Sequence, residues 1–90
     1  MSDLVLTLEH ESGLHARPLA QFVKVVKQYD AEVEVWNLTA NKGPAKGDSP
    51  LKLMLLTVKK GDQIKISAQG GEAEQALEAI RLLVESNFGE

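Results

Sequence analysis

The spacing of apolar residues changes several times along the chain, and this pattern constrains the fold more than any other feature of the sequence. Leu4, Leu6 and Leu8 recur at every second position, as expected for a half-buried strand. Over residues 16–28 the spacing changes to three and four, as on one face of a helix. The chain therefore alternates between strands and helices, and each element has one apolar face to bury.

The first predicted helix has its apolar stripe at Leu19, Phe22, Val23, Val26 and Tyr29. Pro18 must lie in its first turn, because deeper in a helix it would remove a hydrogen bond and clash with the preceding turn. Before this helix, the polar cluster HESG interrupts the strand pattern. Gly13 is the expected turn residue there.

The middle of the chain predicts a second strand over residues 31–38. The segment TANKGPAKGD follows, and its turn-forming residues predict a hairpin with a weak third strand. Ser49 and Pro50 then form a helix-start signal, with serine as N-cap and proline at the first helical position. We expect a short helix of about two or three turns.

A last strand and a long helix complete the pattern. Ile64, Ile66 and Ala68 alternate after a turn at Gly61-Asp62, so we expect them to face inward. The helix that follows has its apolar stripe at Ala73, Ala76, Leu77, Ile80, Leu83 and Val84. Glu72 and Glu74 complement the positive end of its dipole, and Gly89 is expected to end it.

This order of elements predicts a single domain over residues 1–90. A sheet with helices on one face buries both kinds of element in two layers. The other face of the sheet would be solvated, and its expected residues are mostly polar: Val5, Thr7, Glu32, Glu34, Lys65 and Ser67. Trp36 is expected on this face or at its edge.

Composition excludes several functional classes. The 90 residues include no cysteine, so disulfides and thiolate sites are excluded. The net charge of −3, with interleaved charges and few aromatic residues, argues against a nucleic-acid surface. The sequence has no apolar run long enough to span a bilayer, and its first ten residues do not resemble a signal peptide. We therefore expect a cytoplasmic domain.

The stretch ESGLHARPLAQFVKVV places His15 and Arg17 at the expected start of the first helix. The first N–H groups of a helix lack partners, and the dipole adds about half a positive charge there. The N–H groups of Ala16 and Arg17, with the cation of Arg17, would suit a doubly charged anion. A neutral imidazole is also a nucleophile. The pattern indicates phosphoryl transfer through His15, with Arg17 and the helix start holding the group.

The residues alone favour a plainer interpretation, in which His15 only caps the helix and Arg17 is a solvated charge. A metal site of His10 and His15 with Glu9 and Glu11 is a weaker alternative, because the spacing fits no common site. A hydrolase built on Ser12 and His15 is weaker still, because no orienting acid is evident. We expect no metal and no cofactor.

The run SGLHARP, followed by an amphipathic helix, resembles the active-site signature of the HPr family. These are the histidine-containing phosphocarriers of the bacterial phosphoenolpyruvate:sugar phosphotransferase system. YDAEVEV is similar to the family's second strand, and VKKGDQIKISAQGGEAEQALEAI to its closing strand and last helix. The resemblance covers nearly the whole chain. It implies an α+β fold, an open-faced β-sandwich with a four-stranded antiparallel sheet and three helices on one face, ordered βαββαβα.

The resemblance also implies roles for the residues of the motif. His15 matches the histidine that accepts a phosphoryl group on its δ nitrogen from enzyme I, then passes it to a IIA domain of a sugar permease. Arg17 matches the arginine that supports this group, and Ser12 a small polar position near the site. With Ala16, these residues would bind the phosphate. Leu19 departs from the family's usual small residue, and we expect it to change packing rather than chemistry.

A second family site is a regulatory serine at the start of the short helix, which aligns with Ser49. Here the surroundings depart from the family pattern: the run is Asp48-Ser49-Pro50-Leu51-Lys52, and the preceding hairpin is a few residues longer. A phosphate on Ser49 would lie beside Asp48 and experience like-charge repulsion. We therefore favour a role for Ser49 as N-cap, and HPr kinase/phosphorylase remains an optional partner.

The resemblance places the partner surface for enzyme I and IIA domains on two helices. By position its residues are Ala20, Gln21, Lys24 and Lys27, with Leu51 and Met54. Leu51 and Met54 could equally belong to the core. We expect a monomeric carrier that does not turn over alone. The alternatives are a regulatory paralogue that acts by protein–protein interaction, and a carrier of a nitrogen or dihydroxyacetone branch.

Overall fold

The computed structural model describes residues 2–90, so Met1, the first residue of the expected domain, lies outside the described residues. In chain order the elements are β1 (Ser2–Thr7), α1 (Ala16–Lys27), β2 (Glu32–Asn37), β3 (Lys42–Lys46), α2 (Pro50–Met54), β4 (Gln63–Gln69), α3 (Ala73–Glu85) and a 3-10 turn η1 (Asn87–Gly89). The four strands form one antiparallel sheet in the order β1-β4-β2-β3. The predicted α+β sandwich is confirmed.

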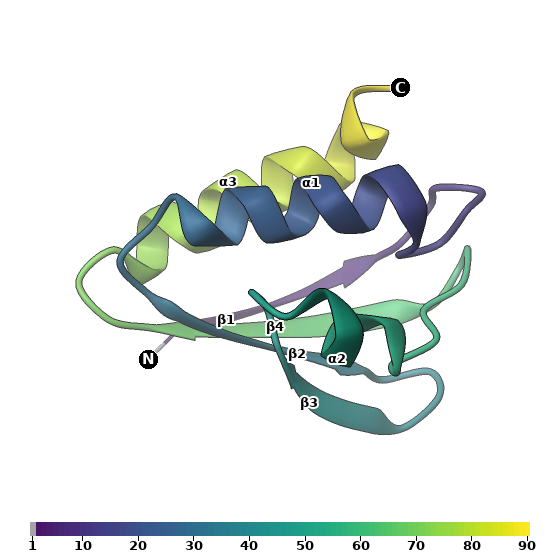
Figure 1. Cartoon of the computed structure of the whole chain (residues 1–90), viewed down its shortest axis with the longest axis horizontal. Coiled ribbons are helices and arrows are strands. Elements are labelled where there is room, and N and C mark those ends of the chain that lie inside the picture. The colour runs from purple at the N-terminus through teal and green to yellow at the C-terminus, as the bar shows by residue number, and fades with distance from the viewer. Residues whose placement is uncertain (1) are drawn as a thin grey trace.

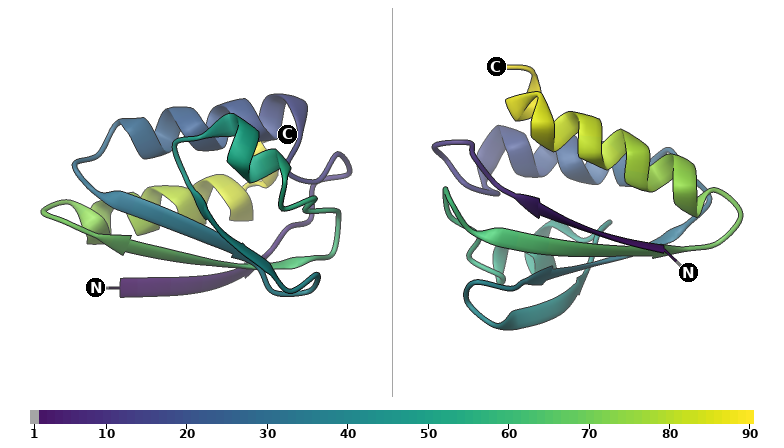
Figure 2. Two further views of the ribbon diagram at one scale, coloured as in Figure 1. Left: turned by 60° about the horizontal axis from the view of Figure 1, so that its bottom comes forward. Right: turned by 180° about the vertical axis from the view of Figure 1, so that it is seen from behind.

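The sheet and the helices form two layers. Helices α1 and α3 lie side by side over one face of the sheet, and α2 lies by β3 and the neighbouring side of α1 (Figures 1 and 2). Both predicted stripes face inward: Phe22 and Ile80 are fully buried between the helices and the sheet. The amphipathic patterns therefore direct each helix onto the core.

Strand β4 lies in the interior of the sheet, with Ile64, Ile66 and Ala68 buried as expected. Ile66 pairs with Leu4 of β1 on one side and with Val35 of β2 on the other. A shift of one residue would turn the apolar side chains of β4 to the solvent. The hydrophobic pattern of three strands thus fixes one register.

The outer face of the sheet is mostly polar, with one exception to the expected set. Ser67 is buried, because this short side chain of an interior strand is flanked by Asp3 and Glu34 on the neighbouring strands. Trp36 lies on this face as expected, with the Lys65 Nζ 5.1 Å from its ring centroid. Lys65 also lies 3.8 Å from the Asp3 carboxylate.

Helix α2 is shorter than the expected two or three turns and ends at Met54. The next amides make tighter hydrogen bonds, from Leu56 N to Leu53 O and from Thr57 N to Met54 O, both 3.1 Å long. Thr57 then has a positive φ of 48°. With the chain turning at this point, the side chains of both Leu53 and Leu56 are buried. We attribute the early end of α2 to the packing of these two side chains in the core.

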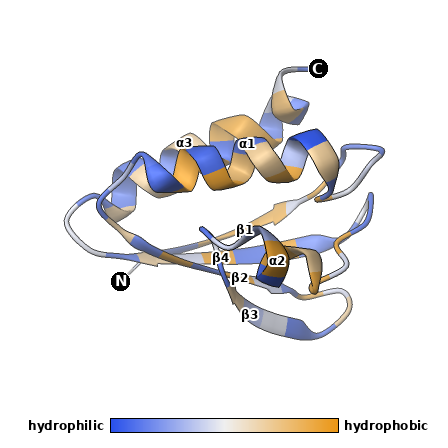
Figure 3. Cartoon of the chain, in the orientation of Figure 1, coloured by the Kyte–Doolittle hydropathy of each residue, from blue (hydrophilic) through white to orange (hydrophobic). Residues whose placement is uncertain are grey.

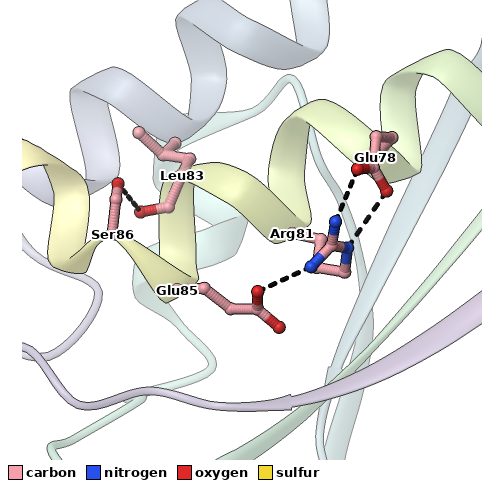
Figure 4. Close-up of polar contacts among 5 residues, drawn as sticks. All are labelled: Glu78, Arg81, Leu83, Glu85 and Ser86. Carbon is pink, nitrogen blue, oxygen red and sulfur yellow. Dashed lines mark hydrogen bonds and ion pairs between the residues drawn. The ribbon is translucent and has the colours of Figure 1, made fainter.

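Helix α3 ends at Glu85, so the expectation that Gly89 ends it is wrong. The hydroxyl of Ser86 donates to the carbonyl of Leu83 at 3.1 Å (Figure 4). Beyond it, Asn87, Phe88 and Gly89 have φ values of 55°, 59° and 79°. These left-handed residues turn the chain away from the axis of α3 (Figure 1), and Phe88 is buried. The start of α1 and the C-terminal end lie on the same side of the molecule (Figure 1).

The exposed side of α3 carries a small ionic network. The guanidinium of Arg81 donates to Glu78 and to Glu85, with nitrogen–oxygen distances of 2.5 and 2.6 Å (Figure 4). The hydrogen bonds from Arg81 lower the pKa of the Glu78 carboxyl, and the same hydrogen bonds raise the pKa of Arg81. Within residues 2–90, no helix has both the length and the apolar character needed to cross a membrane.

Candidate functional site at the start of α1

The loop before α1 is anchored by Gly13, which is the turn residue that the sequence predicts. Its amide donates to the carbonyl of His10 at 2.9 Å, and its φ is +65°. A Cβ at this position would lie 2.2 Å from the carbonyl oxygen of Val58. Next to it, Leu14 is fully buried and donates its amide to the same oxygen at 3.1 Å. The loop is thus fixed directly before the histidine.

His15 is the N-cap residue of α1, with an extended backbone at φ −134° and ψ 166°. Its carbonyl accepts from Leu19 N at 3.4 Å, which begins the helix. The side chain makes no capping hydrogen bond and is partly exposed. In the plainer interpretation the imidazole of His15 would cap the helix through a side-chain hydrogen bond, and this hydrogen bond is not formed. The ring is available for other chemistry.

Ala16 has a positive φ of 51°, although it is the first residue of α1. This conformation costs a non-glycine residue roughly 1–2 kcal/mol. The sequence gives no signal for it, because alanine ordinarily prefers the helical region. Ala16 and Arg17 nevertheless begin the helix as expected, and both are exposed beside His15.

Arg17 is a solvated cation at the helix start, with 72% of its side chain exposed. Its Nη1 lies 3.9 Å from the Oε2 of Glu90. Ser12 is also exposed, and its backbone amide donates to the Nδ1 of His10 at 3.1 Å. Two residues that sequence reasoning did not assign to the site, His10 and Glu90, therefore contact residues of the motif.

His10 is buried, and its Nε2 lies 3.0 Å from the Oε2 of Glu90. In residues 2–90 no group of three or more histidine, cysteine, aspartate or glutamate side chains could hold a metal ion. The signal for His10 was weak, because a single histidine at the end of a strand pattern has many explanations. The sequence contains no signal for Glu90, since its position depends on the left-handed turn at residues 87–89.

The residues of the predicted partner surface belong to α1 and α2, two helices that are in contact with each other. Ala20, Lys24 and Lys27 are exposed on α1, and Gln21 is partly buried. The exposed fractions of Leu51 and Met54 are 69% and 47%, so neither belongs to the core.

Leu55 extends this surface with 67% of its area exposed, although the sequence did not single it out. In Figure 3, much of α2 has the colour of hydrophobic residues, interrupted by one hydrophilic part. Buried Leu53 supplies the inward side of the same helix. The short helix α2 and its C-cap therefore expose apolar side chains, while Leu53 of the same helix is buried.

Ser49 is confirmed as the N-cap of α2. Its Oγ accepts a hydrogen bond from the amide of Lys52 at 3.3 Å, and Pro50 occupies the first helical position. Asp48 and Lys52 lie on either side of this cap in the chain. The serine thus has a structural role that its sequence context predicted.

Comparison with known proteins agrees with the fold and with the motif. The family model described as "PTS HPr component phosphorylation site" matches residues 4–86. The multiphosphoryl transfer protein of Salmonella typhimurium is 43% identical over 94 residues, covering 100% of this chain and 25% of that protein. This chain thus spans a quarter of the length of that relative.

Two further relatives have lengths close to that of this chain. The phosphocarrier protein HPr of Vibrio cholerae is 43% identical over 75 residues, which cover 83% of this chain and 85% of that protein. The crystal structure of HPr-C-His from Thermoanaerobacter tengcongensis has a TM-score of 0.93 at 32% identity, covering 100% of this chain and 98% of that one. With the histidine and arginine at the start of α1 and the same sheet and helices, this chain belongs to the HPr family of the phosphotransferase system.

Proposed function

We propose that this chain is a phosphoryl carrier of the phosphotransferase system, and that His15 is the residue that carries the group. The observation that supports this most directly is the free imidazole of His15 at the N-cap of α1, beside Arg17. Helix N-termini favour anions through their unpaired N–H groups and the dipole. A nucleophile, a cation and these amides thus meet at one end of one helix.

In the accepting step, we propose that an unprotonated ring nitrogen of His15 attacks the phosphorus of a phosphohistidine on enzyme I. The phosphorus–nitrogen bond of the donor breaks, and its electron pair stays on the donor imidazole. A phosphorus–nitrogen bond forms on His15, at the δ nitrogen by resemblance to the family. Transfer to a IIA domain repeats the exchange with His15 as the leaving group. Arg17 and the helix start stabilise the negative charge in both steps.

The same surface would receive both partners in turn. Leu51 and Met54 of α2 and its C-cap Leu55 are exposed apolar residues, and Lys24 and Lys27 are exposed on α1, which contacts α2. An apolar patch with a charged rim is typical of a protein interface. We propose enzyme I and IIA domains as the partners, because each must bring its own acceptor or donor histidine to His15. Monomeric state and cytoplasmic location stay predictions.

Incubation with phosphoenolpyruvate and a cognate enzyme I tests this function. Intact mass measured at neutral pH should show one phosphoryl group on the wild type, lost on acid treatment and absent in His15→Ala. Arg17→Ala should keep the fold and slow transfer by roughly 10²-fold, as loss of one charge-stabilising donor does in other enzymes. Lys65→Ala, on the opposite face of the sheet, should transfer at the wild-type rate.

An active enzyme I that leaves the wild type unmodified would rule out the carrier. The chain would then be better described as a regulatory paralogue that acts by protein–protein interaction and needs no acceptor. Modification that persists in His15→Ala would instead place the phosphoryl group on another residue. Equal transfer rates for Arg17→Ala and the wild type would remove the role assigned to Arg17.

A further inference from the structure

His10 has both ring nitrogens in contact with polar groups, although its side chain is almost completely buried. The backbone amide of Ser12 donates to Nδ1 at 3.1 Å, so this nitrogen carries no proton. The ring proton is then on Nε2, which lies 3.0 Å from the Oε2 of Glu90. The tautomer of His10 is therefore set by the active-site loop, and it directs an N–H toward a carboxylate.

Phe88 fixes the segment that carries Glu90. Its ring meets His10 edge-on, with centroids 5.8 Å apart and an interplanar angle of 85°. Phe88 is buried and lies in the run of three left-handed residues that follows α3. A left-handed conformation is costly for phenylalanine, so burial of the ring must compensate for this conformation. The turn places Glu90 near Arg17, at the start of α1.

One oxygen of Glu90 is shared by two partners. The Oε2 atom lies 3.0 Å from His10 Nε2 and 3.9 Å from Arg17 Nη1. The contact with His10 is short and partly buried, whereas the contact with Arg17 is longer and exposed. The Glu90 carboxylate therefore interacts more strongly with His10 than with Arg17. Its contact with Arg17 is the one that another anion can replace.

We propose that His10 is a positioning residue, which holds the Glu90 carboxylate beside Arg17 so that an internal anion competes with the phosphoryl group for this cation. The proposal rests on the function proposed above and deepens it. A phosphoryl group on His15 is close to doubly negative. It must replace Glu90 at Arg17, while His10 keeps the carboxylate close enough to repel it. The held group is thereby less stable and easier to pass on.

Two substitutions of His10 separate its two contacts. The side-chain amide of His10→Gln can place an N–H near the position of Nε2, so it should rescue the contact with Glu90. His10→Asn can place an oxygen near the position of Nδ1, so it keeps an acceptor for Ser12 and loses Glu90. Glu90→Gln removes the carboxylate charge itself. Glu34→Gln, on the solvent face of β2, removes one charge elsewhere as a control.

The first measurement uses inorganic phosphate and needs no enzyme I. Phosphate is titrated into each variant, and the amide resonances of Ala16 and Arg17 are followed by NMR. We expect His10→Asn and Glu90→Gln to bind phosphate about three-fold more tightly than the wild type, a shift typical of one exposed ion pair. His10→Gln and Glu34→Gln should stay near the wild-type value. Combining His10→Asn with Glu90→Gln should add nothing further.

The second measurement is the phosphorylation equilibrium with enzyme I and phosphoenolpyruvate. The ratio of modified to free chain should shift toward the modified form about three-fold in His10→Asn and in Glu90→Gln, which follows from the same ion pair. Nitrogen-15 spectra of the imidazoles should show His10 in the tautomer with the proton on Nε2. The chemical shifts of the two ring nitrogens report the contact between His10 and Glu90 directly, independently of any effect on folding.

Each outcome bears on one proposal. If His10→Asn and Glu90→Gln both bind phosphate as the wild type does, the positioning role is wrong. Equal effects of His10→Asn and His10→Gln would also overturn it, because the contact with Ser12 would then be responsible. If phosphate binding changes as expected while enzyme I modifies no variant, the Glu90 carboxylate does compete for Arg17 and the carrier function fails.

Discussion

At the scale of single residues, Gly13 has the most restricted surroundings in the loop that leads to His15. A positive φ and a carbonyl oxygen in the space of a side chain both require glycine there. The next residue, Leu14, is buried and bonded to that same carbonyl of Val58. The loop can therefore approach Val58 and Lys59 closely, and this approach fixes the backbone directly before His15.

We expect Gly13→Ala to lower the free energy of unfolding by about 3 kcal/mol, since left-handed strain and a steric clash add together. Chemical denaturation measures this change. Gly61→Ala is the matched control: its φ is +91°, and no other group lies within 4 Å of the position that a Cβ would take. Gly61→Ala should lower the free energy of unfolding by only about 1–2 kcal/mol. Equal losses in the two variants would show that the contact with Val58 does not matter.

Sequence reasoning identified those residues of the candidate site that lie close together in the chain. The motif identified Gly13, His15 and Arg17, and the structure places all three at the start of α1. It did not find His10 and Glu90 as a pair, because 80 positions of chain separate them and only the completed fold joins them. The left-handed backbone of Ala16 was missed for a related reason: the surrounding loop imposes it.

At the scale of elements, α2 depends on its cap more than the longer helices do. A helix of five residues has few internal hydrogen bonds, so its unpaired end groups form a large share of its backbone. Ser49 satisfies one of these groups through the amide of Lys52. Leu51 and Met54 are exposed to the solvent on the same helix. The conformation of α2, and with it this part of the proposed partner surface, thus depends on the hydroxyl group of Ser49.

We expect Ser49→Ala to lower the free energy of unfolding by about 1 kcal/mol, as the loss of other serine caps does. Thermal or chemical denaturation tests this. Ser49→Thr keeps an oxygen at the cap and should recover most of the loss. Amide exchange at Lys52 and Leu53 should be faster in the alanine variant only. A Ser49→Ala variant as stable as the wild type would mean that the hydrogen bond contributes nothing.

The elements were predictable where the periodicity is long and regular. The stripes of α1 and α3 and the alternation in β4 are confirmed by burial of Phe22, Ile80 and Ile66. The end points of α2 and α3 were not predictable. Burial of Leu56 and Phe88 determines where the chain turns, and this depends on space in the core rather than on local preference.

At the scale of the whole molecule, the side chain of Asn37 joins three separate segments. It is fully buried at the end of β2. Its Nδ2 donates to the carbonyl of Leu56 at 2.9 Å and to the carboxylate of Asp62 at 3.2 Å. Its Oδ1 accepts from the amide of Ala40 at 3.1 Å. The end of β2, the segment that follows α2 and the turn before β4 are held together by this one amide.

We expect Asn37→Ala to lower the free energy of unfolding by about 3 kcal/mol, because buried polar groups would lose their partners. Denaturation measured by circular dichroism tests this. Gln75→Ala removes an exposed amide from α3 and should stay within about 0.5 kcal/mol of the wild type. A small effect of Asn37→Ala would indicate that solvent replaces these bonds and that the three segments are held by apolar contacts.

The interior position of β4 also has a consequence for the order in which the domain can be completed during synthesis. In the sheet formed by residues 2–90, strand β1 lies at an edge and pairs with β4, with Ser2 opposite Ala68 and Thr7 opposite Gln63. Pairing between such distant segments requires closure of a long loop, which slows folding. The loop before His15 contacts Val58, close to the start of β4. We therefore expect the loop that carries His15, the proposed acceptor, to reach its final conformation only after residues 58–69 have been synthesised.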